Sequence, residues 1–314
     1  MLSENIKKIY LGESEVQKMY LGENLIYPRE PAVDDYVMLG TTTGSTDFMI
    51  GSSTSITGRS DCIKVHVVQN PGGINTMYVK QEDVLKTPVC FYGDYSGFNS
   101  YEGKKILSID KWNIDTSNVT RIDFMFKDCR ELKKVDLRGF NTSKVTQMKS
   151  LFQNCPSLVS VDLSDFNTEN VTSIDYMFDG CSSLDSLDVS NFNTINVTSM
   201  SNIFGNCNNL TELDLRAFDT TNCSSLYLFD GSYKINKLYL SRNFFNSKTD
   251  SYVFNYLYYW TDPESLAMFV EAITAHDGGG KEVCFVEETY NALTRTQKNA
   301  IKAKGWSISY YVHS

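Results

Sequence analysis

The sequence has few of the residues and motifs on which most enzymes depend. Of its 314 residues only 3 are histidine, and none of them stands in an H-E-x-x-H pattern or beside a spaced set of carboxylates. There is no P-loop, no G-x-G-x-x-G and no G-x-S-x-G segment. We therefore expect a protein that is not an enzyme, with no cofactor and no metal site.

Long apolar segments and an excess of positive charge are also missing. No run of 18 apolar residues occurs, and residues 1–12 contain no signal-peptide h-region. The net charge of −9 disfavours binding to nucleic-acid phosphates and to anionic lipid. We expect no nucleic-acid partner and no membrane insertion. The chain is expected to remain where it is made, or to leave by a route without a signal peptide.

Cysteine pairs at metal-binding spacing are absent, although the chain has 8 cysteines. Four of these recur every 26 residues, and each follows a phenylalanine by three positions. Cysteines placed by a repeat are usually small buried apolar residues, so we predict reduced thiols throughout. The recurring residues are Cys129, Cys155, Cys181 and Cys207.

A repeat of 26 residues between positions 107 and 240 is the dominant feature of the sequence. Segments such as Val161-Asp162-Leu163 alternate as a short strand does. Met200, Ile203, Phe204 and Cys207 have the spacing of one helix face. One short strand and one short helix per coil predict a solenoid whose strands lie about 4.8 Å apart in a parallel sheet. The most regular columns are Phe126, Phe152, Phe178, Phe204 and Leu132, Leu158, Leu184, Leu210.

The repeat pattern M-F-x-x-C-x-x-L-x-x-L-D-L-S-x-F-N-T-x-N-V-T resembles the BspA-like leucine-rich repeats of bacterial surface proteins. Four rows match it closely and a fifth imperfectly, so the resemblance covers about half of the chain. It implies a leucine-rich-repeat solenoid that works in binding or adhesion, and it does not imply catalysis.

The flanking segments differ from the repeat and complete an α+β fold of four parts. Residues 1–30 are predicted to form an N-terminal β-ribbon. Residues 31–105 contain short β-segments separated by glycine, serine and proline, which predicts a small all-β, sandwich-like module. The solenoid then covers residues 106–260. Residues 261–314 are predicted to form an α/β cap that covers the edge of the last coil.

The N-terminal ribbon contains two short apolar strands at a spacing of ten residues, and it resembles the leader of phage and prophage structural proteins. Apolar strands without a core of their own either cover the neighbouring β-module or add to the sheet edge of a partner. We favour the partner and predict a docking segment. Its residues are Ile9, Tyr10, Leu11, Met19, Tyr20 and Leu21.

Two groups of residues are candidates for ligand binding. One is a column of aspartates on the outward side of the predicted strands, and the other is an aromatic cluster before the cap. The aspartates bind a cation or cationic ligand, or they accept hydrogen bonds from neighbouring side chains and backbone, which we favour. The aromatic residues fill the junction with the cap, which we favour, or form a stacking platform. The candidates are Asp110, Asp136, Asp162, Asp188, Asp214, Tyr252, Tyr256, Tyr258, Tyr259 and Trp260.

Three classes of function remain open from the sequence. We favour a structural component of a phage virion or phage-like particle, made in the bacterial cytoplasm. Its N-terminal segment would dock to other particle proteins, and its solenoid would recognise a protein or glycan of the host surface. A bacterial cell-surface adhesin and an intracellular interaction scaffold are the alternatives. The sequence leaves the oligomeric state open.

Overall fold

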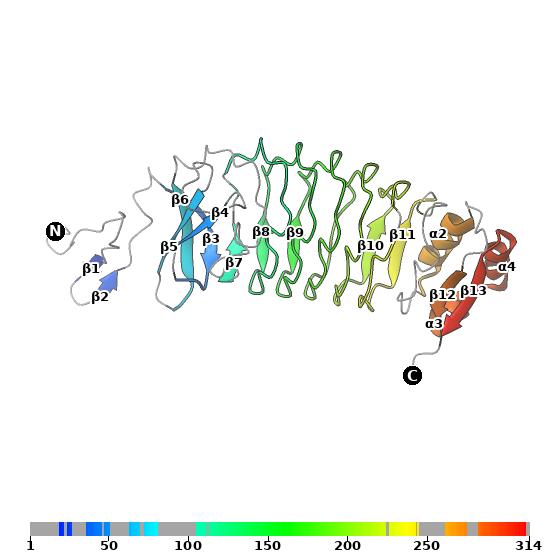
Figure 1. Ribbon diagram of the computed structural model, residues 1–314. Helices are drawn as coiled ribbons and strands as arrows, with labels where there is room; N and C mark the ends of the chain where they lie inside the picture. Colours follow the sequence, from blue (N-terminus) through cyan, green and yellow to red (C-terminus); the bar gives the residue numbers. More distant parts are fainter. Residues whose placement is uncertain are drawn as a thin grey trace.

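The computed structural model describes residues 19–21, 24–26, 36–45, 47–50, 63–69, 72–80, 105–110, 112, 114–223, 226–242, 244, 261–274 and 282–311. Its described parts run from antiparallel strands, through a row of coils, to a unit that contains helices (Figure 1). The fold is mixed α+β, with a core built mostly on sheets and with few helices in the described ranges. The predicted α+β class is confirmed at this level.

The largest sheet has seven strands and joins the predicted β-module to the first coils. Its spatial order is β4-β5-β6-β3-β7-β8-β9, antiparallel as far as β7 and parallel beyond it. The described strands of residues 36–80 form one sheet that continues across position 105, whereas residues 51–62 and 81–104 of the predicted sandwich-like module lie outside the described residues. In chain order the strands are β3 (Tyr36–Thr42), β4 (Phe48–Ile50), β5 (Ile63–Val68), β6 (Asn75–Lys80), β7 (Ile106–Ile109), β8 (Lys134–Asp136) and β9 (Ser160–Asp162).

Close approach of β3 to β7 explains a glycine in the middle of a strand. A Cβ atom at Gly40 would lie 2.0 Å from the Ser108 carbonyl oxygen. Only glycine avoids this clash, so Gly40 allows the antiparallel strands to cover the edge of the first coil.

The predicted helix of each coil is replaced by hydrogen-bonded turns, which we call the turn side (residues 122–129, 148–155, 174–181 and 200–207). The amides of Ile174, Tyr176 and Phe178 donate to carbonyl oxygens of the next coil, at 2.8–3.0 Å. Such amides are not available for the i→i−4 bonds of an α-helix, so the helix prediction was wrong. The predicted apolar face is nevertheless buried, since Met200 and Phe204 have no exposed surface.

The turn side requires left-handed backbone at two positions per coil. One column holds residue types that tolerate this conformation, namely Asp128, Asn154, Gly180 and Asn206. The other column holds Phe124, Ser150, Tyr176 and Asn202, with φ between 52° and 62°. A left-handed conformation costs an ordinary L-residue roughly 1–2 kcal/mol, so the bulky rings at Phe124 and Tyr176 are outliers.

Aromatic rings stack through the middle of the coils. The ring centroids of Phe126 and Phe152 are 5.3 Å apart, and those of Phe152 and Phe178 are 5.7 Å apart. The Phe204 ring continues the stack 6.2 Å beyond Phe178. All four side chains are fully buried, so the predicted phenylalanine column is confirmed as core.

The cysteine column lies beside these rings. Burial raises the pKa of the Cys181 thiol well above its ordinary value and that of Cys207 to about 12. Each of these thiols donates to a phenylalanine carbonyl of the preceding coil, at 3.2 Å. The five cysteines whose side chains are described, Cys129, Cys155, Cys181, Cys207 and Cys223, are buried and free, which confirms the prediction for them.

Polar residues of the F-N-T-x-N-V segment also connect the coils. The buried hydroxyl of Thr168 donates to the Asn193 carbonyl oxygen at 3.0 Å and accepts the Asn193 amide at 2.7 Å. The side chain of Asn170 donates to the Ser143 carbonyl oxygen at 2.8 Å. These threonine and asparagine columns satisfy backbone groups that the turns leave unpaired.

The C-terminal part covers the last coil strand with a helix. Strands β10 (Glu212–Leu215) and β11 (Lys237–Leu240) pair in parallel, and the Leu238 amide donates to the Ser265 hydroxyl at 2.9 Å. Ser265 lies in the first turn of α2 (Pro263–Thr274), where the Asp262 carboxylate accepts its amide. A βαβ unit follows, made of β12 (Glu282–Val286), α3 (Glu287–Ala292), α4 (Arg295–Ala303) and β13 (Ser307–Tyr311).

The N-terminal ribbon is described only in part. Strands β1 (Met19–Leu21) and β2 (Asn24–Ile26) pair antiparallel and, among the described strands, form a sheet of their own. Met19, Tyr20 and Leu21 thus lie in a strand, whereas Ile9, Tyr10 and Leu11 lie outside the described residues.

Candidate binding surface

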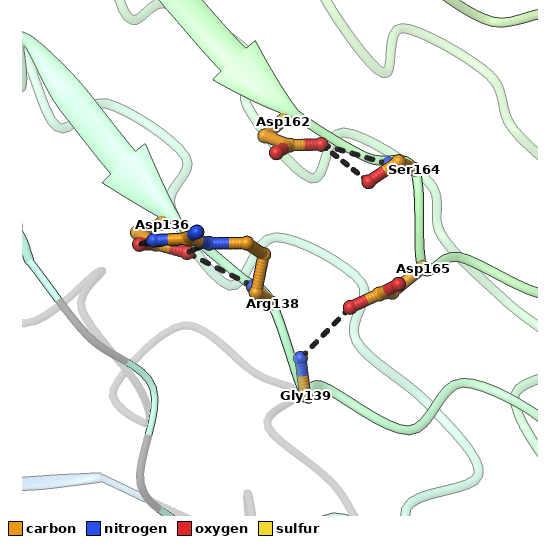
Figure 2. A network of polar contacts seen from close by, with 6 residues as sticks. All are labelled: Asp136, Arg138, Gly139, Asp162, Ser164 and Asp165. Carbon is orange, nitrogen blue, oxygen red and sulfur yellow. Dashed lines mark hydrogen bonds and ion pairs between the residues drawn. The ribbon is translucent and has the colours of Figure 1, made fainter.

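The aspartate column forms an ordered row on what we call the strand side (residues 134–138, 160–164, 186–190 and 212–216). Asp136 and Asp162 end β8 and β9 and are direct partners in the parallel register (Figure 2). Asp110 follows β7, and Asp214 lies in β10. Asp188 belongs to a described coil to which no strand is assigned. The repeat spacing therefore places all five carboxylates along one side of the coils.

Two of the carboxylates are neutralised by an arginine two residues later. Arg138 donates to Asp136 through its backbone amide at 3.1 Å, its Nε at 3.0 Å and its Nη2 at 2.5 Å. Arg216 holds Asp214 in the same way, with Nη2 again at 2.5 Å. These charge-assisted bonds hold the pKa of both carboxyls below the ordinary value.

The two carboxylates between these pairs have serine partners instead. The amide and hydroxyl of Ser164 both donate to Oδ1 of Asp162, at 3.0 and 2.7 Å (Figure 2). The Ser190 amide donates to Oδ1 of Asp188 at 2.9 Å. Serine hydrogen bonds lower the pKa of both carboxyls, so they are ionised at neutral pH. In each of them Oδ2 makes no hydrogen bond or ion pair with another described residue.

Further polar contacts fix the backbone around this row. The Asp165 carboxylate accepts the Gly139 amide of the preceding coil at 3.1 Å (Figure 2). The Asn191 side chain donates to the Leu163 and Phe166 carbonyl oxygens, at 2.8 and 3.0 Å. The centre of the strand side is therefore a rigid acidic surface between two arginine–aspartate pairs.

The geometry favours hydrogen bonding over a cation strip as the structural role of the aspartates. Each carboxylate accepts bonds from its own turn, and the Ser108 hydroxyl supplies one to Asp110 at 3.1 Å. Within the described ranges, no group of three or more histidine, cysteine or carboxylate residues is arranged to hold a metal ion. The sequence predicted neighbouring side chains as the hydrogen-bond donors. It did not predict that the donor stands two residues after the aspartate, as it does for Asp136, Asp162, Asp188 and Asp214.

Acid should destabilise the coils through these carboxylates. The pKa values of Asp136, Asp162, Asp188 and Asp214 lie below the ordinary value of 3.8, so each group adds stability above that value. This stability is lost as the pH falls through the lowered values. We expect a constant Tm above about pH 5 and a falling Tm below the ordinary value. Asp136→Asn and Asp188→Asn should each flatten the acid limb, and a Tm that rises on acidification would contradict the assignment.

The aromatic candidates before the cap are not placed by the structure. Tyr252, Tyr256, Tyr258, Tyr259 and Trp260 all lie outside the described residues. Earlier in the chain, Tyr227 and Tyr233 have 38% and 48% of their surface exposed.

The coil region matches a known family. The family described as "Mycoplasma protein of unknown function, DUF285" matches residues 99–185 and 159–258, which together span just over half of the chain. The chain belongs to the DUF285 family. The matched range contains every coil from β7 to β11, so the repeat itself is the DUF285 element.

Two wider comparisons add nothing to the DUF285 match. No curated protein and no solved structure matches the chain. None of the helices in the described ranges combines the length and apolar character that a membrane span requires.

Proposed function

We propose that this DUF285 protein is a non-enzymatic binding protein built on a BspA-like leucine-rich-repeat solenoid. The observation that carries the proposal is the strand side, where each of four successive coils adds one carboxylate held in place by the residue two positions later. Such a row presents fixed polar groups at the spacing of the coils, which suits recognition of an extended partner surface.

The charge of the strand side indicates the chemistry of the partner. In Asp162 and Asp188 the carboxylate oxygen Oδ2 accepts no hydrogen bond from a described residue. These two residues lie between Arg138 and Arg216, whose side chains are 69% and 61% exposed. A protein surface with basic groups or a glycan with hydroxyl groups would complement this pattern.

The proposed setting is a phage virion or phage-like particle. Support comes from the ribbon, where β1 and β2 pair only with each other among the described strands, and from its resemblance to phage structural leaders. A bacterial cell-surface adhesin is the second candidate. It is favoured by the resemblance of the repeat to the BspA-like repeats of bacterial surface proteins.

Removal of residues 1–27 tests docking by the ribbon separately from recognition by the solenoid. The truncated chain should keep a Tm close to that of the full chain and should still bind cells of the strain that carries the gene. It should be lost from the particle fraction, because the docking segment is gone. Both chains are labelled, and their amounts in particles and on cells are compared.

Each failure of this experiment has a distinct meaning. Unfolding of the truncated chain would show that the ribbon belongs to the intramolecular core. Incorporation of the truncated chain into particles would contradict the docking segment. Recovery of the full chain in the cell envelope, and not in particles, would favour the adhesin.

A further inference from the structure

One column of the turn side carries aromatic residues that its backbone does not favour. Phe124 and Tyr176 have φ values of 62° and 56°. Asn202 occupies the same position in another coil, and it has no large ring that this conformation would strain. The adjacent left-handed column contains only aspartate, asparagine and glycine. Strained conformations that persist despite an easy alternative are typical of functional positions.

Core packing does not account for the Tyr176 ring, whereas the Phe124 ring has the Lys127 ammonium 5.3 Å from its centroid. The Tyr176 side chain is half-buried, while the neighbouring core position is filled by the fully buried Phe178. The Tyr176 hydroxyl makes no hydrogen bond to another described residue. Tyrosine with a free hydroxyl and partial exposure has the properties of a contact residue.

The two aromatic residues of this column stand two coils apart, with Ser150 between them. The column ends at Asn202, because the Asn202 amide donates to Tyr227 and the Phe204 amide to Leu228, which leaves no residue in the left-handed position of the next coil. Core rings of successive coils are 5.3 and 5.7 Å apart, so Phe124 and Tyr176 are separated by roughly 11 Å. Backbone bonds between coils hold this spacing.

Polar groups that suit sugar hydroxyls lie beside the aromatic column. The Asn206 side chain donates to Oδ1 of Asp179 at 2.9 Å, and the Gln153 side chain donates to Oδ2 at 3.0 Å. Asn154 and Asn206 are both exposed. These amides are fixed in place and keep donor and acceptor capacity for a ligand.

We propose that the turn side binds an extended β-1,4-linked glycan, with one disaccharide spanning the two coils between Phe124 and Tyr176. In such a chain each sugar is turned over relative to the last, so the same ring face returns once per disaccharide. One disaccharide has about the length that separates Phe124 from Tyr176. The apolar faces of two sugars, one disaccharide apart in the glycan, would stack on the Phe124 and Tyr176 rings, and the amides would bind hydroxyl groups. This inference goes beyond the proposed function, because it adds a binding surface separate from the strand side and names the ligand class that this surface would take.

Titration calorimetry of the full chain with two hexasaccharides tests the proposal. The hexamer of β-1,4-linked N-acetylglucosamine should bind, and maltohexaose, whose α-1,4 linkage coils the chain, should not. Tyr176→Asn should weaken binding at least about tenfold. Its Tm should not fall, because asparagine tolerates the left-handed backbone. The control Ile195→Asn replaces an exposed apolar residue, 49% exposed, outside the turn side and should bind normally.

Several outcomes would overturn the proposal. These are equal binding of both hexasaccharides, no binding of the β-1,4-linked hexamer, or normal binding by Tyr176→Asn. If the protein still attaches to cells in those cases, only the glycan inference fails and the proposed binding function stands. If the native chain binds neither the hexasaccharide nor cells, the glycan inference and the proposed binding function are both contradicted.

Discussion

Phe178→Ala is expected to lower the free energy of unfolding by about 3–5 kcal/mol. The Phe178 ring is fully buried and stacks between Phe152 and Phe204, with centroids 5.7 and 6.2 Å away. Truncation removes both contacts and leaves a cavity in the middle of the row. The neighbouring coils cannot close it, because backbone bonds fix their spacing. Urea denaturation followed by circular dichroism measures the effect.

The matched control for this prediction is an exposed aromatic residue. Tyr233 is 48% exposed, so Tyr233→Ala should change the free energy of unfolding by less than about 1 kcal/mol. A comparably small loss for Phe178→Ala would show that its column is not core. Since β3 pairs with β7 in the shared sheet, destabilisation should spread to the antiparallel strands as well as to neighbouring coils.

Deletion of one complete coil is expected to leave a folded protein, whereas deletion of half a coil is not. Removal of residues 159–184 joins Leu158 to Asp185 in the register of the repeat, so each core column loses one member and closes again. Removal of residues 159–171 takes out fewer residues but joins a turn to the wrong side of the next coil. Every column beyond the junction is then displaced.

Thermal unfolding of the two deletion variants shows the difference. The 26-residue deletion should retain a single cooperative transition with a modestly lower Tm. The half-coil deletion should lose the cooperative transition of the coils. Similar behaviour of the two variants would contradict the 26-residue coil as the structural unit.

The buried columns of the coils could be predicted from the sequence because their spacing is regular. Phe126, Cys155 and Leu184 each recur at the same interval and are all fully buried. The helix prediction failed for a physical reason. The apolar spacing of a helix face also fits a succession of tight turns, and the sequence does not show whether an amide bonds within its coil or to the next one.

Other features had weaker signals in the sequence. Pairing of β3 with β7 joins segments far apart in the chain, and only Gly40 marks the close approach. The left-handed positions are visible at Gly180 but not at Tyr176, whose residue type predicts another conformation. The aspartate row was predicted from the sequence. Its carboxylates accept hydrogen bonds from residues two positions later, such as Ser164 and Arg138.

The binding of cells by a strand-side variant tests the central claim most directly. Asp162→Asn combined with Asp188→Asn removes both unneutralised charges and keeps an Oδ1 acceptor for the amides of Ser164 and Ser190. The control, Glu169→Gln combined with Glu271→Gln, removes two exposed charges elsewhere. At equal Tm, the aspartate variant should bind cells of the source strain at least about tenfold more weakly than the native chain. The control should bind as the native chain does, and native binding by the aspartate variant would contradict the strand side as the recognition surface.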